Sequence, residues 1–498
     1  MCRKDSLGRI FCLEASGGVF VDQAGRELGR EEGAKLAATL LTLVVFLWVA
    51  ATSSIRGQVL GVVLLALVLW SLYPRHHLLS SILVIALLSL FQVSLSPGEF
   101  IDSLLSTYGG SGLWIIVSGF ILAEAMKTSG LAKRVALWIV SALGGNPDRV
   151  ILSVALANLA VAPLSPSTTA KAFLLLPICN GLIEAFGVEK GRSRYGAGVM
   201  LMSMAANNIC STGFLTATVP NPISAEYIRT ASGIDLGWLG WLRMALPLTL
   251  ILLAASWLLC RWMFRPEVEA TPGALERIRD LRRGLGPLSR GEVLVASLFS
   301  LFLLLWITEG LHGLNSGLIS LALSLLLFLP GVGVLRIGGF AGEVPWGSIA
   351  LFAASMFLAK AVGHWRAFDP VALSLFHHLG LSRLPPLPFI SLTVLVSMFL
   401  HLAFTSTTVY ATVMIPLIIS LTRLQGLQPQ AVAIPVAFLT PIAVILPVNT
   451  IPNIVFYSSG YFSQRQMIAY GLLTSLISAL LILLIGLPYW RLLGLLQA

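Results

Sequence analysis

The sequence predicts an all-α polytopic membrane protein with about 11 transmembrane helices and two re-entrant helical hairpins, arranged as two inverted repeats. Three observations predict this fold. The 498 residues are 57% hydrophobic and 11% charged, with a mean hydropathy of +0.89, a composition that soluble domains do not have. Many apolar runs approach the roughly 20 residues that a helix needs to cross a bilayer. A polar phrase and a proline-containing break each occur twice, once in each half of the chain.

The N-terminal segment, residues 1–35, has mixed charges and no apolar core, so we expect a cytoplasmic tail and not a secretory signal peptide. The first transmembrane helix is expected within 36–56. Two apolar stretches, 150–186 and 387–424, are interrupted by polar residues and fit re-entrant hairpins better than continuous spans. The expected spans are 36–52, 57–73, 78–95, 111–127, 195–213, 241–264, 291–308, 314–331, 347–363, 431–447 and 467–489.

The duplicated phrases are the most informative part of the sequence. STTAKAFLLLP begins at Ser167 and STTVYATVMIP begins at Ser406, and each ends on a proline at the same offset. Each is followed by Thr-x-Pro-Asn, at residues 218–221 and 450–453. Polar, helix-breaking residues are costly in hydrocarbon unless they line a cavity or are buried in protein. Matched breaks in two halves of a membrane chain therefore point to the substrate site of a transporter.

The repeat extends beyond the phrases, because LAEA at Leu122 matches LAKA at Leu358. The first repeat is expected over 57–264 and the second over 291–498, with a basic loop at 265–290 between them. Each copy has five spans, and this odd number places consecutive copies in opposite orientations.

Positive charge sets the expected orientation. The formal net charge is +10, and in a membrane protein such an excess gathers in cytoplasmic loops. The N-terminus, the first hairpin and the 265–290 loop are therefore expected in the cytoplasm, with the chain in the plasma membrane, or in the inner membrane of a bacterium. Residues 274–284 fit either a basic amphipathic helix on the membrane surface or a solvated loop. The charges that share this side are Lys127, Lys133, Arg134, Arg149, Lys190, Arg192, Arg194 and the arginines from Arg261 to Arg290.

The order of five segments carries a family resemblance: PLSPSTTAKAFLLLP, FLTATVPNPIS, GPLSRGEV, AFTSTTVYATVMIP and VNTIPN. Over about 110–490 the chain resembles the divalent anion/sodium symporter family, carriers of di- and tricarboxylates and sulfate. The first-half phrases look closer to its citrate and dicarboxylate exchanger branch, and the second half to its sodium symporters. The family's two tips read Ser-Asn-Thr, whereas threonine replaces the asparagine here at Thr168 and Thr407. The resemblance implies a homodimer and an elevator-type movement.

An anion in a membrane needs hydrogen-bond donors and positive potential, and helix N-termini supply both. The serines and threonines of the two Ser-Thr-Thr phrases could supply such donors at the start of a helix. The alternative is that they only cap helices or bond to their own backbone. Lys171 fits either a counter-charge to a substrate carboxylate or a position in a water-filled vestibule away from the substrate. The expected substrate-binding residues are Ser167, Thr168, Thr169, Lys171, Ser406, Thr407 and Thr408.

Sodium prefers oxygen ligands, which hydroxyls and the carbonyls of unwound helices supply. Of the residues expected around sodium, Asn221 and Asn453 fit bracing of the loops better than direct ligation of the ion. The expected sodium-site residues are Ser167, Thr168, Thr216, Thr218, Pro220, Asn221, Ser406, Thr407, Thr450, Pro452 and Asn453.

The leading hypothesis is a secondary active transporter of small divalent anions, with sodium symport first, sodium-independent exchange second and another oxyanion permease third. The partners expected are the anion, sodium, the lipid bilayer and a second copy of the chain, with no nucleic acid. An intramembrane enzyme is the alternative from another class. The sequence has no HExxH motif, no paired intramembrane aspartates, no Walker phosphate loop and no metal-binding cysteine spacing. We therefore expect no enzymatic activity and no cofactor. The choice among succinate, malate, citrate and sulfate stays open.

Overall fold

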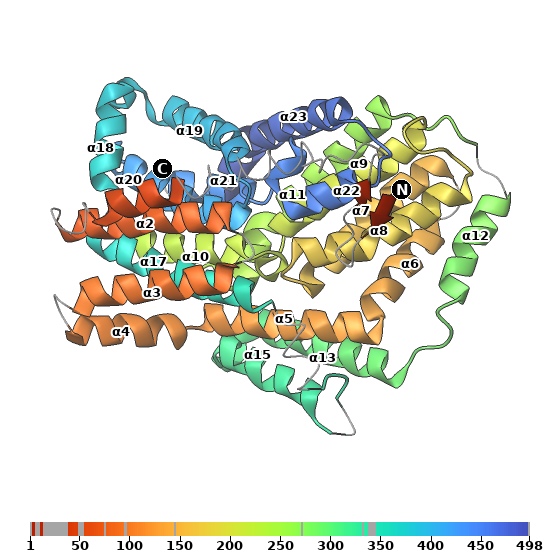
Figure 1. The fold of residues 1–498 in the computed structure, drawn as a ribbon, viewed down its shortest axis with the longest axis horizontal. Helices are drawn as coiled ribbons and strands as arrows, with labels where there is room; N and C mark the ends of the chain where they lie inside the picture. Colours follow the sequence, from red (N-terminus) through yellow and green to blue (C-terminus); the bar gives the residue numbers. More distant parts are fainter. Residues whose placement is uncertain are drawn as a thin grey trace.

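Helices dominate the protein in the computed structural model (Figure 1). The structure describes residues 2–4, 10–12, 38–47, 54–73, 76–93, 97–143, 146–269, 272–330, 333–336 and 345–496. The only strands among these residues are β1 (Cys2–Lys4) and β2 (Ile10–Cys12), which pair antiparallel. The predicted fold class is confirmed, although the all-α prediction did not include this short ribbon. Most of the predicted tail and parts of the predicted first span lie outside the described residues.

After a short helix at Ala38–Leu47, the first half contains a continuous series of helices. They are α2 (Ile55–Leu72), α3 (His77–Val93), α4 (Pro97–Tyr108), α5 (Ser111–Ser129), α6 (Leu131–Leu143), α7 (Pro147–Val161), η2 (Ala162–Leu164), α8 (Thr168–Ala185), α9 (Arg194–Thr212), η3 (Leu215–Ala217), α10 (Pro220–Ser232) and α11 (Trp238–Met263). The next helix, α12 (Pro272–Arg283), lies in the predicted basic loop.

The second half is also a series of helices. Its elements are α13 (Arg290–Ile307), α14 (Glu309–His312), α15 (Ser316–Leu325), η4 (Leu326–Phe328), α17 (Trp346–Trp365), α18 (Asp369–His378), η5 (Leu381–Arg383), α19 (Pro386–Leu400), η6 (His401–Ala403), α20 (Thr407–Leu424), α21 (Gln430–Leu439), η7 (Pro447–Asn449), α22 (Ile451–Tyr457), α23 (Gln464–Leu481), η8 (Ile482–Gly486) and α24 (Leu487–Leu492).

Nine helices among the described residues are long and apolar enough to cross a membrane. Three of them are arms of the predicted hairpins, at Pro147–Leu164, Pro386–Ala403 and Thr407–Leu424. Shorter apolar helices occupy further predicted spans, including His77–Phe91 and Gln430–Leu439. These three hairpin arms have 18 residues each and are therefore about as long as a membrane span.

Several helices were not among the predicted spans, and four of them are α4, α6, α12 and α18. Each has between 10 and 13 residues, which is too short to cross the hydrocarbon core. Figure 1 shows α12 and α18 at opposite ends of the long axis, running across the direction of most other helices. These helices connect the longer ones, and a search for spans by length does not find them.

The two halves pack against each other in a reciprocal manner. Helix α3 packs against α17, and their counterparts α15 and α5 also pack together. In the same way α8 packs against α22, while α20 packs against α10. Figure 1 shows α18 at one end of the molecule and α6 on the side of the other end, next to α12. The inverted relation of the two halves and their boundaries stay predictions.

The start of α13 is fixed by a shared carboxylate. The Ser289 hydroxyl accepts from the Glu292 N–H at 3.1 Å, and Glu292 accepts from the Ser289 N–H at 2.8 Å, which is a capping box. The same carboxylate lies 2.6 Å from Arg134 Nε on α6. Arg134 also donates to the carbonyls of Leu285 and Gly286. The basic loop is thereby joined to α6, as expected for segments predicted on the same side of the membrane.

Loops that do not belong to the basic group also meet one another. Arg423, at the end of α20, donates to the carbonyl of Ala231 at 3.2 Å, and Gln425 donates to the carbonyl of Leu384 at 2.6 Å. Neither contact involves the basic loop at 265–290, and the orientation of the chain in the membrane stays a prediction.

Candidate functional site

The first repeated phrase lies where α7 and η2 end and α8 begins. Pro163 and Pro166 flank the end of η2, and a proline has no N–H to continue a helical ladder. Ser167 is extended and caps α8, because its hydroxyl accepts from the Ala170 N–H at 3.1 Å. Thr168 then begins the helix. The other N–H groups of this first turn have no partner within the helix, so they remain available to an acceptor.

The second phrase has the same construction at the junction of η6 and α20. Ser406 is extended, and its hydroxyl accepts from the Val409 N–H at 3.4 Å. Asn449, on η7, donates to the carbonyls of His401 and Phe404 at 3.2 Å each and braces this tip. In both halves, the capping role of the serine is therefore observed, and it leaves the neighbouring threonine hydroxyls available for other contacts.

The two Thr-x-Pro-Asn segments form matched breaks after α9 and α21. Asn221 donates to the carbonyls of Ser211 and Phe214 at 2.7 and 2.8 Å. Asn453 donates to the carbonyls of Ala443 and Leu446 at 2.6 and 3.0 Å. Both asparagines thus hold the carbonyls of the preceding unwound helix, as the bracing interpretation expects.

We expect Asn221→Ala and Asn453→Ala each to lower the free energy of unfolding by about 2–3 kcal/mol, because two buried carbonyls lose their donor. The melting temperature of the purified protein measures this effect. Asn315→Ala is a suitable control, since Asn315 only caps α15 and its loss costs about 1 kcal/mol. A melting temperature unchanged by Asn221→Ala would show that the brace does not support the break.

A cavity of about 540 Å³ brings both phrases and both breaks together. All six predicted hydroxyl residues of the two Ser-Thr-Thr phrases line it, as do Thr218, Thr450 and Pro452. We call it the central cavity. Thr216, Pro220, Asn221 and Asn453 do not line it; they lie behind the cavity surface in the breaks. The remaining lining residues are Trp70, Ser71, Leu72, His77, Phe120, Pro166, Val219, Ser348, Leu351, Thr405, Val448, Ile451 and Ile454.

The central cavity has no lysine, arginine, aspartate or glutamate in its lining. Its polar surface consists of hydroxyl groups, the His77 ring and the N-terminal turns of α8 and α20, which carry partial positive charge. The absence of carboxylates from this lining leaves no negatively charged side chain there to repel an anion. Among the cavities of the described residues, this lining is therefore well suited to a small anion.

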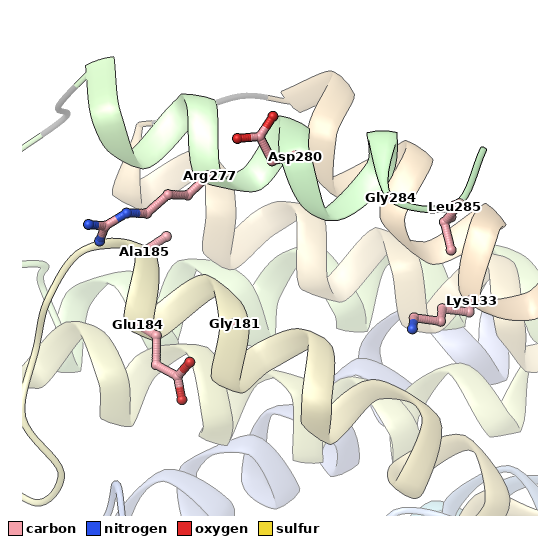
Figure 2. Close-up of a pocket in the computed structure, with 8 residues that line it drawn as sticks. All are labelled: Lys133, Gly181, Glu184, Ala185, Arg277, Asp280, Gly284 and Leu285. Carbon is pink, nitrogen blue, oxygen red and sulfur yellow. The ribbon is translucent and has the colours of Figure 1, made fainter.

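A cavity at the α12 end offers a useful contrast (Figure 2). It has a volume of about 690 Å³ between α6, α8 and α12, and its lining carries Lys133 and Arg277 together with Glu184 and Asp280. The two positive charges are matched by two carboxylates, so this cavity does not favour a dianion. Helix α12, where the sequence left a surface helix or a solvated loop open, is a helix that packs against α6 and α8.

Lys171 lies away from the central cavity. Its side chain is 2% exposed, and its ammonium donates to the Ser211 hydroxyl and to the Ala217 carbonyl, both at 2.8 Å. It lines a neighbouring cavity of about 510 Å³, together with Glu124 and Lys127. Lys171 is therefore not part of the lining of the central cavity. Its ammonium is instead hydrogen-bonded to a carbonyl of the first break.

Several buried oxygen atoms near the first tip have no hydrogen-bond donor among the described residues. They include Oδ1 of Asn207 and Oδ1 of Asn221. Asn207 also binds the tip directly, since its amide donates to the Thr168 carbonyl at 2.9 Å. In the second break, by contrast, Oδ1 of Asn453 accepts from Asn208 at 3.2 Å. Oxygen atoms of this kind fit a hard cation such as sodium.

Sequence reasoning missed the wall of the central cavity that comes from α2, α3, α5 and α17. It includes Trp70, His77, Phe120 and Ser348. None of these residues belongs to a repeated phrase, and each lies in or beside an ordinary apolar helix. The only sequence signal for this wall was a short polar, basic run around His77 between two predicted spans. Such a run is typical of any loop, so it does not indicate a binding site.

Comparisons with known proteins agree with this arrangement. The family model for the transmembrane region of sodium:sulfate symporters matches residues 31–496. A Cupriavidus necator protein described as a membrane protein is 26% identical over 455 residues, covering 89% of this chain and 88% of that protein. The sodium-dependent dicarboxylate transporter SdcS of Staphylococcus aureus is 29% identical over 451 residues, 85% of each chain.

Two solved structures share the fold at low sequence identity. The YdaH transporter of Alcanivorax borkumensis has a TM-score of 0.52 and 16% identity, covering 80% of this chain and 88% of that one. MtrF of Neisseria gonorrhoeae, from a class of antimetabolite efflux pumps, has a TM-score of 0.52 and 13% identity, covering 78% and 83%. Because the family model matches nearly the whole chain, the chain belongs to the sodium:sulfate symporter family, whose members are membrane transporters and not enzymes.

Proposed function

We propose that the protein is a secondary active transporter that binds a small divalent anion in the central cavity and couples its movement to sodium. One observation carries this proposal: both Ser-Thr-Thr tips, with Thr218 and Thr450, line one cavity that has no carboxylate in its lining. Family membership and the name of the relative SdcS support a divalent anion and sodium as the transported species.

The anion is held by donors from both halves. Hydroxyl groups of Thr168, Thr169, Thr407 and Thr408 and the free N–H groups at the starts of α8 and α20 donate to its oxygens. The opposing carboxylate or sulfate oxygens accept several such bonds at once, and hydrogen bonds to charged groups are the stronger kind. Lys171 attracts the anion by its positive charge and holds the first break in place through the Ala217 carbonyl, without touching the anion.

Sodium binds behind the tips, among hydroxyls and carbonyl oxygens. The first-half set is Ser167, Thr168, Thr216, Thr218, Pro220 and Asn221, and the second-half set is Ser406, Thr407, Thr450, Pro452 and Asn453. The unpartnered oxygens of Asn207 and Asn221 support the first-half set. An ion there adds positive charge next to the tip, and this favours the anion in turn.

The tips and breaks are proposed to move as one body in an elevator-type cycle. The support is their mutual packing: α8 contacts α22, α20 contacts α10, and Asn208 on α9 donates to Asn453 in the other half. The wall from α2, α3, α5 and α17 would remain in place while this body carries the anion across. The division into repeats 57–264 and 291–498 is part of this proposal.

The proposed setting is the plasma membrane, with the N-terminus and the α12 end in the cytoplasm and the chain paired as a homodimer. The grouping of basic loops at one end supports the orientation. In this orientation, the cavity that Lys171 lines with Glu124 and Lys127 opens towards the cytoplasmic side.

Exchange without sodium is the second candidate, and one observation favours it. The Lys171 ammonium already binds the Ala217 carbonyl of the first break, at a place where a transported cation would find oxygen ligands. A positive charge at this break would reduce the need for an ion. The threonines at positions 168 and 407, in place of the family's asparagines, point in the same direction.

Uptake of labelled succinate, citrate and sulfate into proteoliposomes tests the proposal. Each anion is offered outside with sodium or with choline, and with or without unlabelled anion inside. Uptake that saturates and requires external sodium supports symport. Uptake that requires internal anion and ignores sodium would establish exchange instead. Failure to take up any of the three, by protein that is folded and inserted, would contradict transport of these divalent anions.

A further inference from the structure

The central cavity has a second wall, which is separate from the two tips. Trp70, Ser71 and Leu72 come from the end of α2, His77 from the start of α3, and Ser348 from α17. Helices α2, α3 and α17 pack against one another, and the α17 backbone approaches His77 closely, since a Cβ on Gly347 would lie 3.4 Å from His77 Cβ. The histidine is thus held in place at the cavity surface.

One hydrogen bond fixes the protonation pattern of the His77 ring. Its Nε2 lies 3.0 Å from the carbonyl oxygen of Trp70. A carbonyl oxygen can only accept, so Nε2 carries a proton in both charge states of the ring. When His77 is neutral, Nδ1 is therefore a bare acceptor, which repels an anion. When His77 is protonated, Nδ1 becomes a donor and the ring carries a positive charge.

No other ionisable side chain lines the central cavity. Few other ionisable groups on the packed helices could cause a pH dependence at this site. Helix α3 has no further ionisable residue. On α17, Lys360 and His364 lie near the far end, about 18 Å or more along the helix from Ser348. Arg56 lies near the far end of α2. On α5, Glu124 lies one turn beyond Phe120 and lines the neighbouring cavity. On α4, Asp102 is exposed.

We propose that His77 is a specificity-determining residue of the anion site, which holds a proton at Nδ1 against the bound anion. The inference rests on the proposed function and deepens it. The cavity then binds one proton together with one divalent anion, and the proton comes from the aqueous side. A dianion long enough to touch both the tips and this wall gains a charged contact that the tips, with hydroxyls and N–H groups alone, do not provide.

The test is the pH dependence of uptake at saturating sodium. Labelled sulfate and fumarate are suitable probes, because both remain doubly charged between about pH 6 and pH 8, where an ordinary histidine changes its charge. We expect the half-saturating anion concentration of the wild type to be about threefold or more lower at pH 6 than at pH 8. In His77→Gln, which keeps a donor for the Trp70 carbonyl, this difference is expected to disappear.

His76→Gln is the matched control, since His76 is an exposed neighbour that does not line the cavity, and it is expected to behave as the wild type. His77→Lys, with a permanent charge, is expected to give tight binding at both pH values, which also guards against a folding defect of the glutamine variant. A pH dependence that persists in both His77 variants would overturn the inference and point to another group, such as the buried His401. If the wild type takes up none of sulfate, fumarate, succinate and citrate at either pH, the proposed function fails, and this inference fails with it; uptake of sulfate or fumarate that does not change with pH in the wild type overturns this inference alone.

Discussion

Replacing the hydroxyl group of Thr168 or of Thr407 with a methyl group is expected to weaken anion uptake about tenfold or more. The substitutions Thr168→Val and Thr407→Val preserve shape and helix start but remove one donor from the central cavity. A hydrogen bond to a charged group contributes about 1.5–3 kcal/mol, and 1.4 kcal/mol corresponds to a factor of ten in affinity. Combining both substitutions is expected to reduce uptake to background.

Thr422→Val is the matched control for these variants. Thr422 is a buried threonine on α20, its hydroxyl donates to the Ile418 carbonyl at 2.7 Å, and it does not line the central cavity. The half-saturating concentrations of succinate and sulfate measure the effect. If the double variant transports as well as Thr422→Val does, the two tips do not bind the anion.

Replacing Lys171 with methionine is expected to change the response to sodium more than any other single substitution does. Without the ammonium, the carbonyl of Ala217 and the hydroxyl of Ser211 lose a donor, and we expect a loss of about 1–3 kcal/mol in stability when sodium is absent. Sodium restores this loss, because the freed carbonyl lies in the same break as the unpartnered oxygen of Asn221. The melting temperature in sodium and in choline measures both effects.

Lys127→Met provides the comparison for this variant. The Lys127 side chain is 62% exposed and pairs with Glu124 at 3.3 Å, and exposed pairs contribute little to stability. We expect it to respond to sodium as the wild type does. An equal melting temperature for Lys171→Met and wild type in both cations would show that Lys171 is not part of a cation site.

Much of the fold follows from the sequence, because its main signals are local. Apolar runs located the long helices, and the two Ser-Thr-Thr phrases located the ends of α7 and α19 and the starts of α8 and α20. The short helices α6 and α18 were not predicted, because their 13 and 10 residues give no span-length run, and for α12 the sequence left a surface helix and a solvated loop open. Their place depends on packing between segments that are distant in sequence.

The site was predictable only where it is duplicated. Six hydroxyl residues of the two tips were identified from the repeated phrase, and all six line one cavity. The direction of the Lys171 side chain was not predictable, since it depends on the carbonyl of Ala217, forty-six residues later in the chain. Trp70 and His77 were missed for a similar reason: their place in the cavity depends on how α2 and α3 pack against α17.

The central claim is that the two repeated tips and breaks form one binding site for a divalent anion and sodium. The most direct measurement is the melting temperature of the purified protein with succinate, citrate or sulfate, each in sodium and in choline, because a ligand of the native state raises it by mass action. Our account predicts an increase that needs sodium and one of these anions together and that is lost in the Thr168→Val/Thr407→Val variant. An increase that persists undiminished in that variant would contradict it.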